Sequence, residues 1–186
     1  MRKSKVEAAD TRRRIVEAAA REFRLHGIQA TGLNDVMLPL GLTQGGFYRH
    51  FSSKDQLVAE ACSQAMTEVI DGLEAAARDS DADNGLAAVV NAYVSEDHRD
   101  TQTGGCPLAA MGSELARADE QTRAAAAQGF EELVDVLVKR MGGQARSSAV
   151  FAVAAMIGAV TMSRVVEDSD ASTAILEDVK QHLGAM

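Results

Sequence analysis

Apolar residues recur every three or four positions along most of the chain, which is the spacing of helices that bury one face. Near the N-terminus, Ile15, Ala19 and Phe23 share one helical face. Aromatic residues make up only 4% of the chain and alanine is abundant, which also favours packed helices over strands. The pattern therefore predicts an all-α protein. The next segment repeats it at positions i, i+3, i+4 and i+7 with Leu33, Val36, Met37 and Leu40.

Start and stop signals divide this pattern into about nine helices. Thr31 and Thr43 are suited to cap the second and third helices, and the segment beginning at Ser53 matches a capping box ahead of the fourth. Pro39 should keep the second helix short, because proline interrupts helical hydrogen bonds. The expected helices span residues 10–25, 31–40, 43–51, 54–78, 85–96, 106–118, 119–141, 144–167 and 172–183.

The third helix, over residues 43–51, combines an apolar inner side with a small, polar and cationic outer side. Phe47 and Phe51 stand one turn apart and should both point inward. A helix of this kind can lie in a DNA groove while it is anchored to its own domain. Together with the preceding helix and a turn at Gly41, the segment predicts a helix-turn-helix.

The outer side of this segment supplies the candidate DNA contacts. Gln44 is the best candidate for reading a base edge, because its amide both donates and accepts hydrogen bonds. Gly45 and Gly46 either let the backbone approach the groove closely or make room for a neighbouring helix. The alternative for Arg49 is a solvated face, as it is for His50, and for Tyr48 a core position with its hydroxyl in water. The remaining candidates are expected at phosphates, and the full group is Thr31, Thr43, Tyr48, Arg49, His50 and Lys54.

Charge divides the 186 residues into two parts. Residues 1–60, which begin with a loose basic arm over residues 1–9, carry ten Lys or Arg and seven Asp or Glu, whereas residues 61–186 carry nine and twenty. The net charge of −8 argues against a general affinity for nucleic acid. The basic N-terminal part would still be drawn to phosphates, so only one face is expected to meet DNA.

Residues 11–58 resemble the N-terminal domain of the TetR family of transcriptional regulators. The resemblance implies a homodimer that usually represses, that binds a palindromic operator in double-stranded DNA, and that a small-molecule effector releases. We therefore expect a three-helix DNA-binding domain over residues 1–56 and a helical ligand-binding and dimerisation domain over residues 57–186. The matching positions are Arg14 to Ala19, Phe23, Gly27, Ala30, Thr31, Gly41 to Tyr48, His50, Phe51, Lys54 and Leu57.

A dimer is also expected on physical grounds, because one helix-turn-helix contacts too few phosphates for tight binding. The helix over residues 144–167 is the best candidate surface, since its small side chains permit close approach of a partner helix. The same helix could instead form the core of its own domain, and both can hold together. The candidate interface residues are Ala154, Ala155, Gly158, Ala159 and Met162.

A ligand pocket would lie between the central helices of the second domain. Methionine adapts its shape and suits a permissive pocket, although methionine at helical spacing is more often part of the core. No group of polar residues identifies the chemistry of the ligand. The candidate lining residues are Met66, Ile70, Tyr93, Cys106, Met111, Phe130, Phe151 and Met156.

Cys106 stands at the start of a helix after a glycine-containing loop. A helix N-terminus lowers the pKa of a thiol, so this cysteine could sense oxidants or electrophiles. The segment from Gly105 to Ala110 is similar to a subgroup of the TetR family with a reactive cysteine in this region. The alternative is a small buried cap residue without reactivity. Cys62, inside an apolar helix, is expected to be inert.

The sequence lacks the usual marks of an enzyme. Its four histidines are scattered, no cysteine pair has zinc-ligand spacing, and no cofactor is expected. The longest apolar run, residues 149–162, is shorter than the ~20 residues that span a bilayer, and no signal peptide is evident, so a cytoplasmic protein without membrane contact is expected. A helical small-molecule carrier with a vestigial DNA-binding domain remains an alternative, which a protein that binds ligand but no DNA would favour.

Overall fold

The computed structural model describes residues 5–80, 85–101, 103, 105–142 and 146–186. All regular structure in these residues is helical, so the all-α prediction is confirmed. The described elements are ten α-helices and one short 3₁₀ helix. They are α1 (Lys5–His26), α2 (Leu33–Met37), η1 (Leu38–Leu40), α3 (Gln44–Phe47), α4 (Lys54–Arg78), α5 (Gly85–Tyr93), α6 (Glu96–Asp100), α7 (Pro107–Leu115), α8 (Glu120–Val138), α9 (Arg146–Val165) and α10 (Ser169–Gly184).

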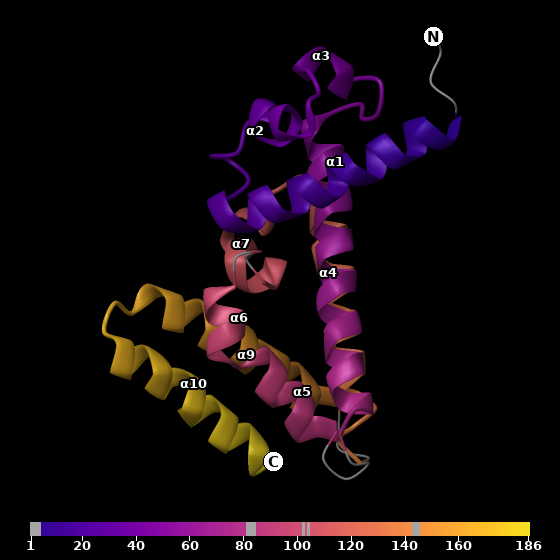
Figure 1. Cartoon of the computed structure of the whole chain (residues 1–186). Helices are drawn as coiled ribbons and strands as arrows, with labels where there is room; N and C mark the ends of the chain where they lie inside the picture. The colour runs from indigo at the N-terminus through magenta and orange to yellow at the C-terminus, as the bar shows by residue number, and fades with distance from the viewer. Residues whose placement is uncertain (1–4, 81–84, 102, 104, 143–145) are drawn as a thin grey trace.

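The helices form an elongated molecule with the N-terminal unit at one end (Figure 1). Helices α1, α2 and α3 lie together at that end, and α4 runs from them along the length of the molecule. Helix α4 packs against α1 near its start and against α5 and α8 further along. Helix α7 contacts α1, α4, α8 and α9, so it lies at the junction between the N-terminal unit and the rest. Helix α10 packs on α9 at the outer edge (Figure 1).

Several helix boundaries differ from the expectation. Helix α1 begins at Lys5, so part of the expected loose arm is helical, while residues 1–4 lie outside the described residues. The second helix is short as expected, because Pro39 falls in a 3₁₀ turn that follows α2. The structure has one α-helix more than the expected nine, since residues 85–100 form α5 and α6 with a break near Ser95, which caps α6. The expected helix start at residue 144, most of the polar loop at 79–84, and Gly104 lie outside the described residues.

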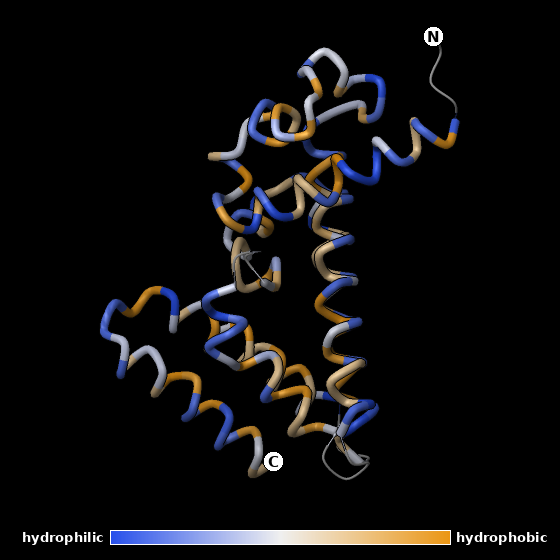
Figure 2. The backbone as a smooth tube through the Cα atoms, in the orientation of Figure 1, coloured by the Kyte–Doolittle hydropathy of each residue, from blue (hydrophilic) through white to orange (hydrophobic). Residues whose placement is uncertain are grey.

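A single hydrophobic core runs through both parts of the chain. It begins with Phe23 and Phe47 in the N-terminal unit and continues along α4 through Leu57 and Met66. Leu137 on α8 belongs to the same buried cluster. Figure 2 shows apolar and polar segments alternating along the helices, as expected for helices that bury one face. Because α4 crosses the expected boundary at residue 56 without interruption, movement of one unit is transmitted directly to the other.

Candidate DNA-binding surface and effector cleft

The segment expected to enter the DNA groove is held from below by aromatic side chains. Phe47 and Phe51 are both buried, and their rings stack with centroids 5.3 Å apart. The guanidinium of Arg12 on α1 lies 4.5 Å from the centre of the Phe51 ring, which ties the segment to α1. The N-cap hydroxyl of Thr43 accepts a 3.3 Å hydrogen bond from the amide of Gly46, as the sequence predicted. Helix α3 is only one turn long, so these anchors rather than helix length fix its position.

The outer side of the segment is open to solvent. The exposed candidates include Gln44, the proposed base reader, and Tyr48, which is 64% exposed and packs its ring edge-on against Phe47. A core position for Tyr48 is therefore excluded. Gly46 and His50 are half-buried. The remaining exposed candidates of the segment are Thr43, Gly45 and Arg49.

The structure also bears on the two glycines. A methyl group added at Gly45 would meet no described atom within 4 Å, and one added at Gly46 would meet only the Thr43 hydroxyl at 3.6 Å. Crowding by a neighbouring helix in the described part of this chain therefore does not account for glycine at either position. The functional alternative, close approach of the backbone to another molecule, is the one that agrees with this geometry.

The expected role of Thr31 as a helix cap is wrong. Helix α2 is capped by Gly32, whose amide donates a 2.7 Å hydrogen bond to the Asp35 carboxylate. Thr31 is 2% exposed, and its hydroxyl donates to the carbonyl of Gly27 at 2.7 Å. The hydroxyl thus closes the turn after α1 and is not presented to a phosphate.

The expected outward orientation of Lys54 is also wrong. Its ammonium donates to two carbonyl oxygens, those of Ile28 and Thr31, each at 2.6 Å. It also lies 5.8 Å from the centre of the Phe23 ring. Since Lys54 is the first residue of α4, these bonds fix the start of α4 against the connection between α1 and α2. Lys54 is a positioning residue for the DNA-binding unit.

A second junction joins α1 to the other end of the molecule through Arg24. Its side chain is 5% exposed and donates to the carbonyl of Gly105 at 3.0 Å and to the Glu68 carboxylate at 3.2 Å. A buried guanidinium needs such partners, because an unpaired buried charge is costly. Arg24 therefore connects the first helix to α4 and to the loop ahead of α7. Neither Arg24 nor Glu68 could be singled out from the sequence, because the contact joins segments far apart along the chain.

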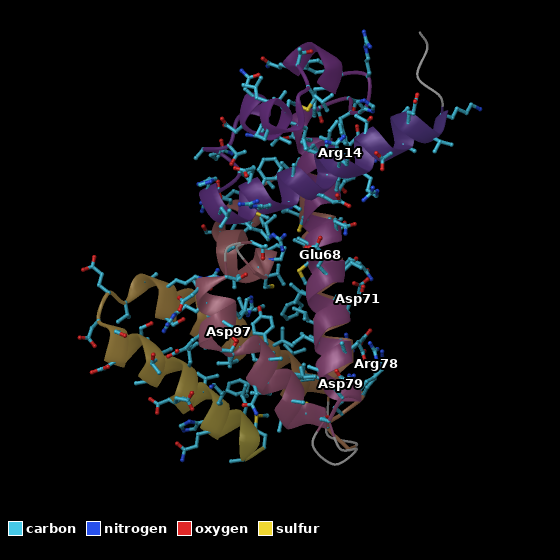
Figure 3. The ribbon with its side chains drawn as sticks, viewed as in Figure 1. Arg14, Glu68, Asp71, Arg78, Asp79 and Asp97 are labelled. Carbon is cyan, nitrogen blue, oxygen red and sulfur yellow. The ribbon has the colours of Figure 1, made fainter. Side chains whose placement is uncertain are left out.

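A cleft of about 500 Å³ opens beside this junction, between α4 and the segment that holds α5 and α6. Glu68 lies on α4 and Asp97 on α6, the helices that border the cleft (Figure 3). Its size is within the range of about 300–1,000 Å³ that is usual for small-molecule sites. Polar and apolar side chains share its walls, and the described lining residues are Glu68, Val69, Gly72, Leu73, Asn91, Ala92, Tyr93, Ser95, Asp97, His98, Thr101 and Gly105.

Of the residues predicted to line a ligand pocket, only Tyr93 borders this cleft. Met66 is buried in the core, where its sulfur lies 4.0 Å from that of Cys106. Phe151 is 63% exposed on α9, so its expected place between the central helices is wrong. Ile70 and Phe130 are half-buried beside the core. Two further candidates, like Met66, are core residues, namely Met111 and Met156.

His98 organises the inner wall of the cleft. Its Nε2 accepts a 2.9 Å hydrogen bond from the amide of Cys106, so that nitrogen carries no proton. Its Nδ1 lies 2.6 Å from the carbonyl oxygen of Tyr93 and is therefore the donor. Both bonds require the neutral ring, and burial lowers the pKa of His98. His98 thus holds the start of α7 without adding charge to the cleft.

The expected lowering of the pKa of the Cys106 thiol is wrong. Cys106 is the N-cap residue of α7, but its side chain is completely buried. Burial raises the pKa of the thiol, and the neighbouring Tyr93 hydroxyl opposes only part of that rise. The Tyr93 hydroxyl itself is buried without a hydrogen-bond partner of acceptable geometry among the described residues. Cys62 is also buried, which raises its pKa to about 12, in agreement with the inert role expected for it.

Helix α9 presents an apolar stripe to solvent. Phe151 and Met162 are 63% and 49% exposed, and Val165 extends the same stripe. Among the candidate interface residues, Ala154 is exposed and Ala155 and Gly158 are half-buried, whereas Ala159 faces the core of its own protomer. By length and composition α9 would be long and apolar enough to cross a membrane. An exposed apolar stripe on a helix that is otherwise packed against α8 and α10 is also what a subunit interface requires.

The fold and the exposed segment define a helix-turn-helix DNA-binding transcriptional regulator. Residues 15–61 match the family model of bacterial regulatory proteins of the tetR family. Residues 82–182, more than half of the chain, match the model of the transcriptional regulator LmrA/YxaF-like C-terminal domain. The chain therefore belongs to the TetR family, in which the proteins are regulators and not enzymes, and it carries a C-terminal domain of the LmrA/YxaF-like type.

Individual relatives agree with this assignment. The chain is 38% identical to the HTH-type transcriptional regulator TtgR of Pseudomonas putida over 81 residues, which cover 44% of this chain and 38% of TtgR. It is 27% identical to the HTH-type transcriptional regulator LmrA of Bacillus subtilis over 137 residues, or 71% of each protein. The crystal structure of a TetR transcriptional regulator from Chloroflexus aurantiacus superposes with a TM-score of 0.80 at 26% identity, covering 97% of this chain and 95% of the other. The chain thus spans under half the length of TtgR.

Proposed function

We propose that this regulator is a repressor that binds a palindromic operator as a homodimer, and that a small molecule in the cleft between α4 and α6 releases it. The observation that carries the DNA-binding part is the exposed ridge of α3, anchored by Phe47 and Phe51 and lined by Gln44 and Tyr48. One ridge contacts few phosphates, and a two-fold pair reads two half-sites.

The exposed stripe on α9 supports the homodimer. Burial of the large apolar side chains of Phe151 and Met162 against the same surface of a second copy would stabilise such a pair. The half-buried Gly158 would allow the two helices to approach closely, since no described atom lies within 4 Å of a methyl group placed there. We assign the interface to Phe151, Ala154, Ala155, Gly158 and Met162.

Release by a small molecule is supported by the position of the cleft. Glu68 lines the cleft and also pairs with Arg24 of α1, so a molecule bound there would act on a contact of the DNA-binding unit. Release by modification of Cys106 has less support, because a buried thiol with a raised pKa forms little thiolate. The ligand route is therefore the one that we propose.

The DNA-binding part is tested with the full chain and a duplex obtained by in vitro selection. Affinity should fall steeply with salt, because binding releases counterions from the phosphates. Gln44→Ala should relax the sequence preference, whereas Arg49→Ala should weaken binding to all duplexes about equally and lower the salt slope by about 1. Affinity that ignores both salt and sequence would reject the proposal.

A further inference from the structure

The cleft between α4 and α6 carries an uncompensated negative charge. Its two charged lining residues in the described part of the chain, Glu68 and Asp97, are both acidic. Glu68 is paired with Arg24, which lies behind it, whereas Asp97 makes no ion pair or hydrogen bond within the described residues. His98 is neutral because its two ring nitrogens are fixed by Tyr93 and Cys106. One negative charge therefore remains for a ligand to balance.

The surroundings strengthen this preference. Residues 61–186 carry twenty acidic and nine basic side chains, which raises the local concentration of cations near the domain. The walls of the cleft include Val69, Leu73 and Ala92, which can cover an apolar body. A small hydrated metal ion would leave these apolar walls without contact. A positively charged organic molecule satisfies both the acidic and the apolar parts of the cleft.

We propose that the effector is an amphipathic organic cation, held by Asp97 and Glu68, whose binding loosens the Arg24 junction between α1 and α4. This inference rests on the proposed role of the cleft as the effector site. A cation beside Glu68 shares the carboxylate that otherwise pairs with Arg24 alone. The guanidinium then loses part of its compensation, and like charges near one another repel.

The consequence for DNA follows from the other contacts of Arg24. Arg24 belongs to α1 and also donates to the carbonyl of Gly105, next to the start of α7. A weaker Arg24 junction lets α1 shift relative to α4 and α7, which sets the position of the DNA-binding unit. By thermodynamic reciprocity, bound operator must lower the affinity for the cation by the same factor by which the cation lowers the affinity for operator.

The charge preference is tested with tetraphenylphosphonium and tetraphenylborate, which have similar shapes and opposite charges. Isothermal titration calorimetry on the full chain should detect the phosphonium and give at least about threefold weaker binding, or none, for the borate. Asp97→Asn should weaken phosphonium binding by about threefold or more. Asp71→Asn is the matched control, because Asp71 lies on α4 near Glu68 but does not line the cleft, and it should leave the affinity unchanged (Figure 3).

Equal or tighter binding of tetraphenylborate, absence of phosphonium binding, or unchanged affinity in Asp97→Asn would each overturn the inference. These measurements contain no DNA, so they are independent of the operator assay. A protein that binds operator but shows no charge preference would retain the proposed function and lose this inference. A protein that binds the phosphonium through Asp97 but no DNA sequence would do the reverse.

The coupling is tested by adding tetraphenylphosphonium to the protein on its selected operator. Operator affinity should fall in the wild type and should fall less in Arg24→Lys, because lysine cannot bridge Glu68 and Gly105 with the same fork of donors. Circular dichroism and the operator affinity of the ligand-free variant report whether Arg24→Lys is folded. An equal loss of affinity in both folded proteins would remove Arg24 from the mechanism.

Discussion

The carboxylate of Glu114 accepts a 3.0 Å hydrogen bond from the backbone amide of Ile28. Its other oxygen accepts a 2.9 Å bond from the amide of Gln29, so one side chain of α7 satisfies two amides just after α1. On the opposite side, the ammonium of Lys54 binds the carbonyl of Ile28. The turn between α1 and α2 is therefore held by α7 and α4 together, and the DNA-binding unit cannot move without breaking one of these bonds.

Glu114→Ala should lower the free energy of unfolding by about 1–3 kcal/mol, because it leaves two amides of this turn without their acceptor. Urea denaturation measures the change. Glu177→Ala is the control, since Glu177 is exposed on α10 and pairs only with Lys180 three residues away. That control should change stability by less than about 0.5 kcal/mol. Equal effects of the two substitutions would show that the Glu114 contacts contribute nothing special.

Gly129→Ala should destabilise the fold by about 1–3 kcal/mol, because the added methyl group would lie 2.5 Å from Cγ of Met66 in the core. Gly72→Ala is the matched variant, since it lies inside α4 and meets nothing within 4 Å. It should stabilise the protein by up to about 1 kcal/mol through the higher helix propensity of alanine. Thermal and urea unfolding compare the two. Opposite signs are expected, and a stabilised Gly129→Ala would contradict the close packing of α4 on α8.

The parts of the structure that depend on neighbours along the chain could be predicted from the sequence. The Thr43 cap, the inward Phe47 and Phe51, and the exposed Gln44 and Tyr48 all follow from spacing within one segment. The all-helical fold follows from the same kind of local pattern, because a helix is specified by residues three and four positions apart.

The errors fall where a distant segment determines the environment. Lys54 has the sequence position of a surface cation, but the turn at Ile28 lies within reach of its ammonium. Cys106 starts a helix, which favours a thiolate, yet complete burial outweighs that effect and raises its pKa. The cleft was missed because Glu68 and Asp97 are adjacent only after folding. Burial and long-range pairs cannot be determined from one sequence by spacing alone.

The pH dependence of stability should reveal the neutral His98. Burial lowers its pKa below 6.5, so the unfolded chain binds more protons than the native protein once the pH falls below about 6.5. The stability is complete above that pH and should be lost as the pH decreases, by at most about 1.4 kcal/mol per pH unit for one group. Carboxylates with lowered pKa, such as Asp119, act only nearer pH 4, so urea unfolding between about pH 7.5 and 5.5 isolates the histidine.

His98→Gln should flatten this pH dependence, because glutamine retains an acceptor for the Cys106 amide but does not titrate. His182→Gln, on the exposed side of α10, is the control and should keep the wild-type slope. If His98→Gln and the wild type lose stability in parallel over this range, the titrating group is not His98.

The proposed interface on α9 is tested with Gly158→Glu. No described atom of the protomer lies within 4 Å of a methyl group at this position, so the substitution should leave the protomer folded while it places a charge in the contact between two copies. Light scattering after gel filtration should find a dimer for the wild type and a monomer for the variant. Gly72→Glu on α4 has equally open surroundings and should remain dimeric. A dimeric Gly158→Glu would place the interface elsewhere.

The two thiols should be slow to react in the native protein. Cys62 and Cys106 are both buried, and burial raises the pKa of each, so few thiolates exist at neutral pH. With a disulfide reagent such as dithiobisnitrobenzoate, the native protein should react only as fast as it opens, and two thiols should react at once in guanidinium. Cys106→Ser identifies which thiol contributes. A fast reaction of one native thiol that disappears in Cys106→Ser would contradict the buried environment and would restore thiol modification as the release signal. Operator release by hypochlorite or quinones in wild type but not in Cys106→Ser would lead to the same conclusion.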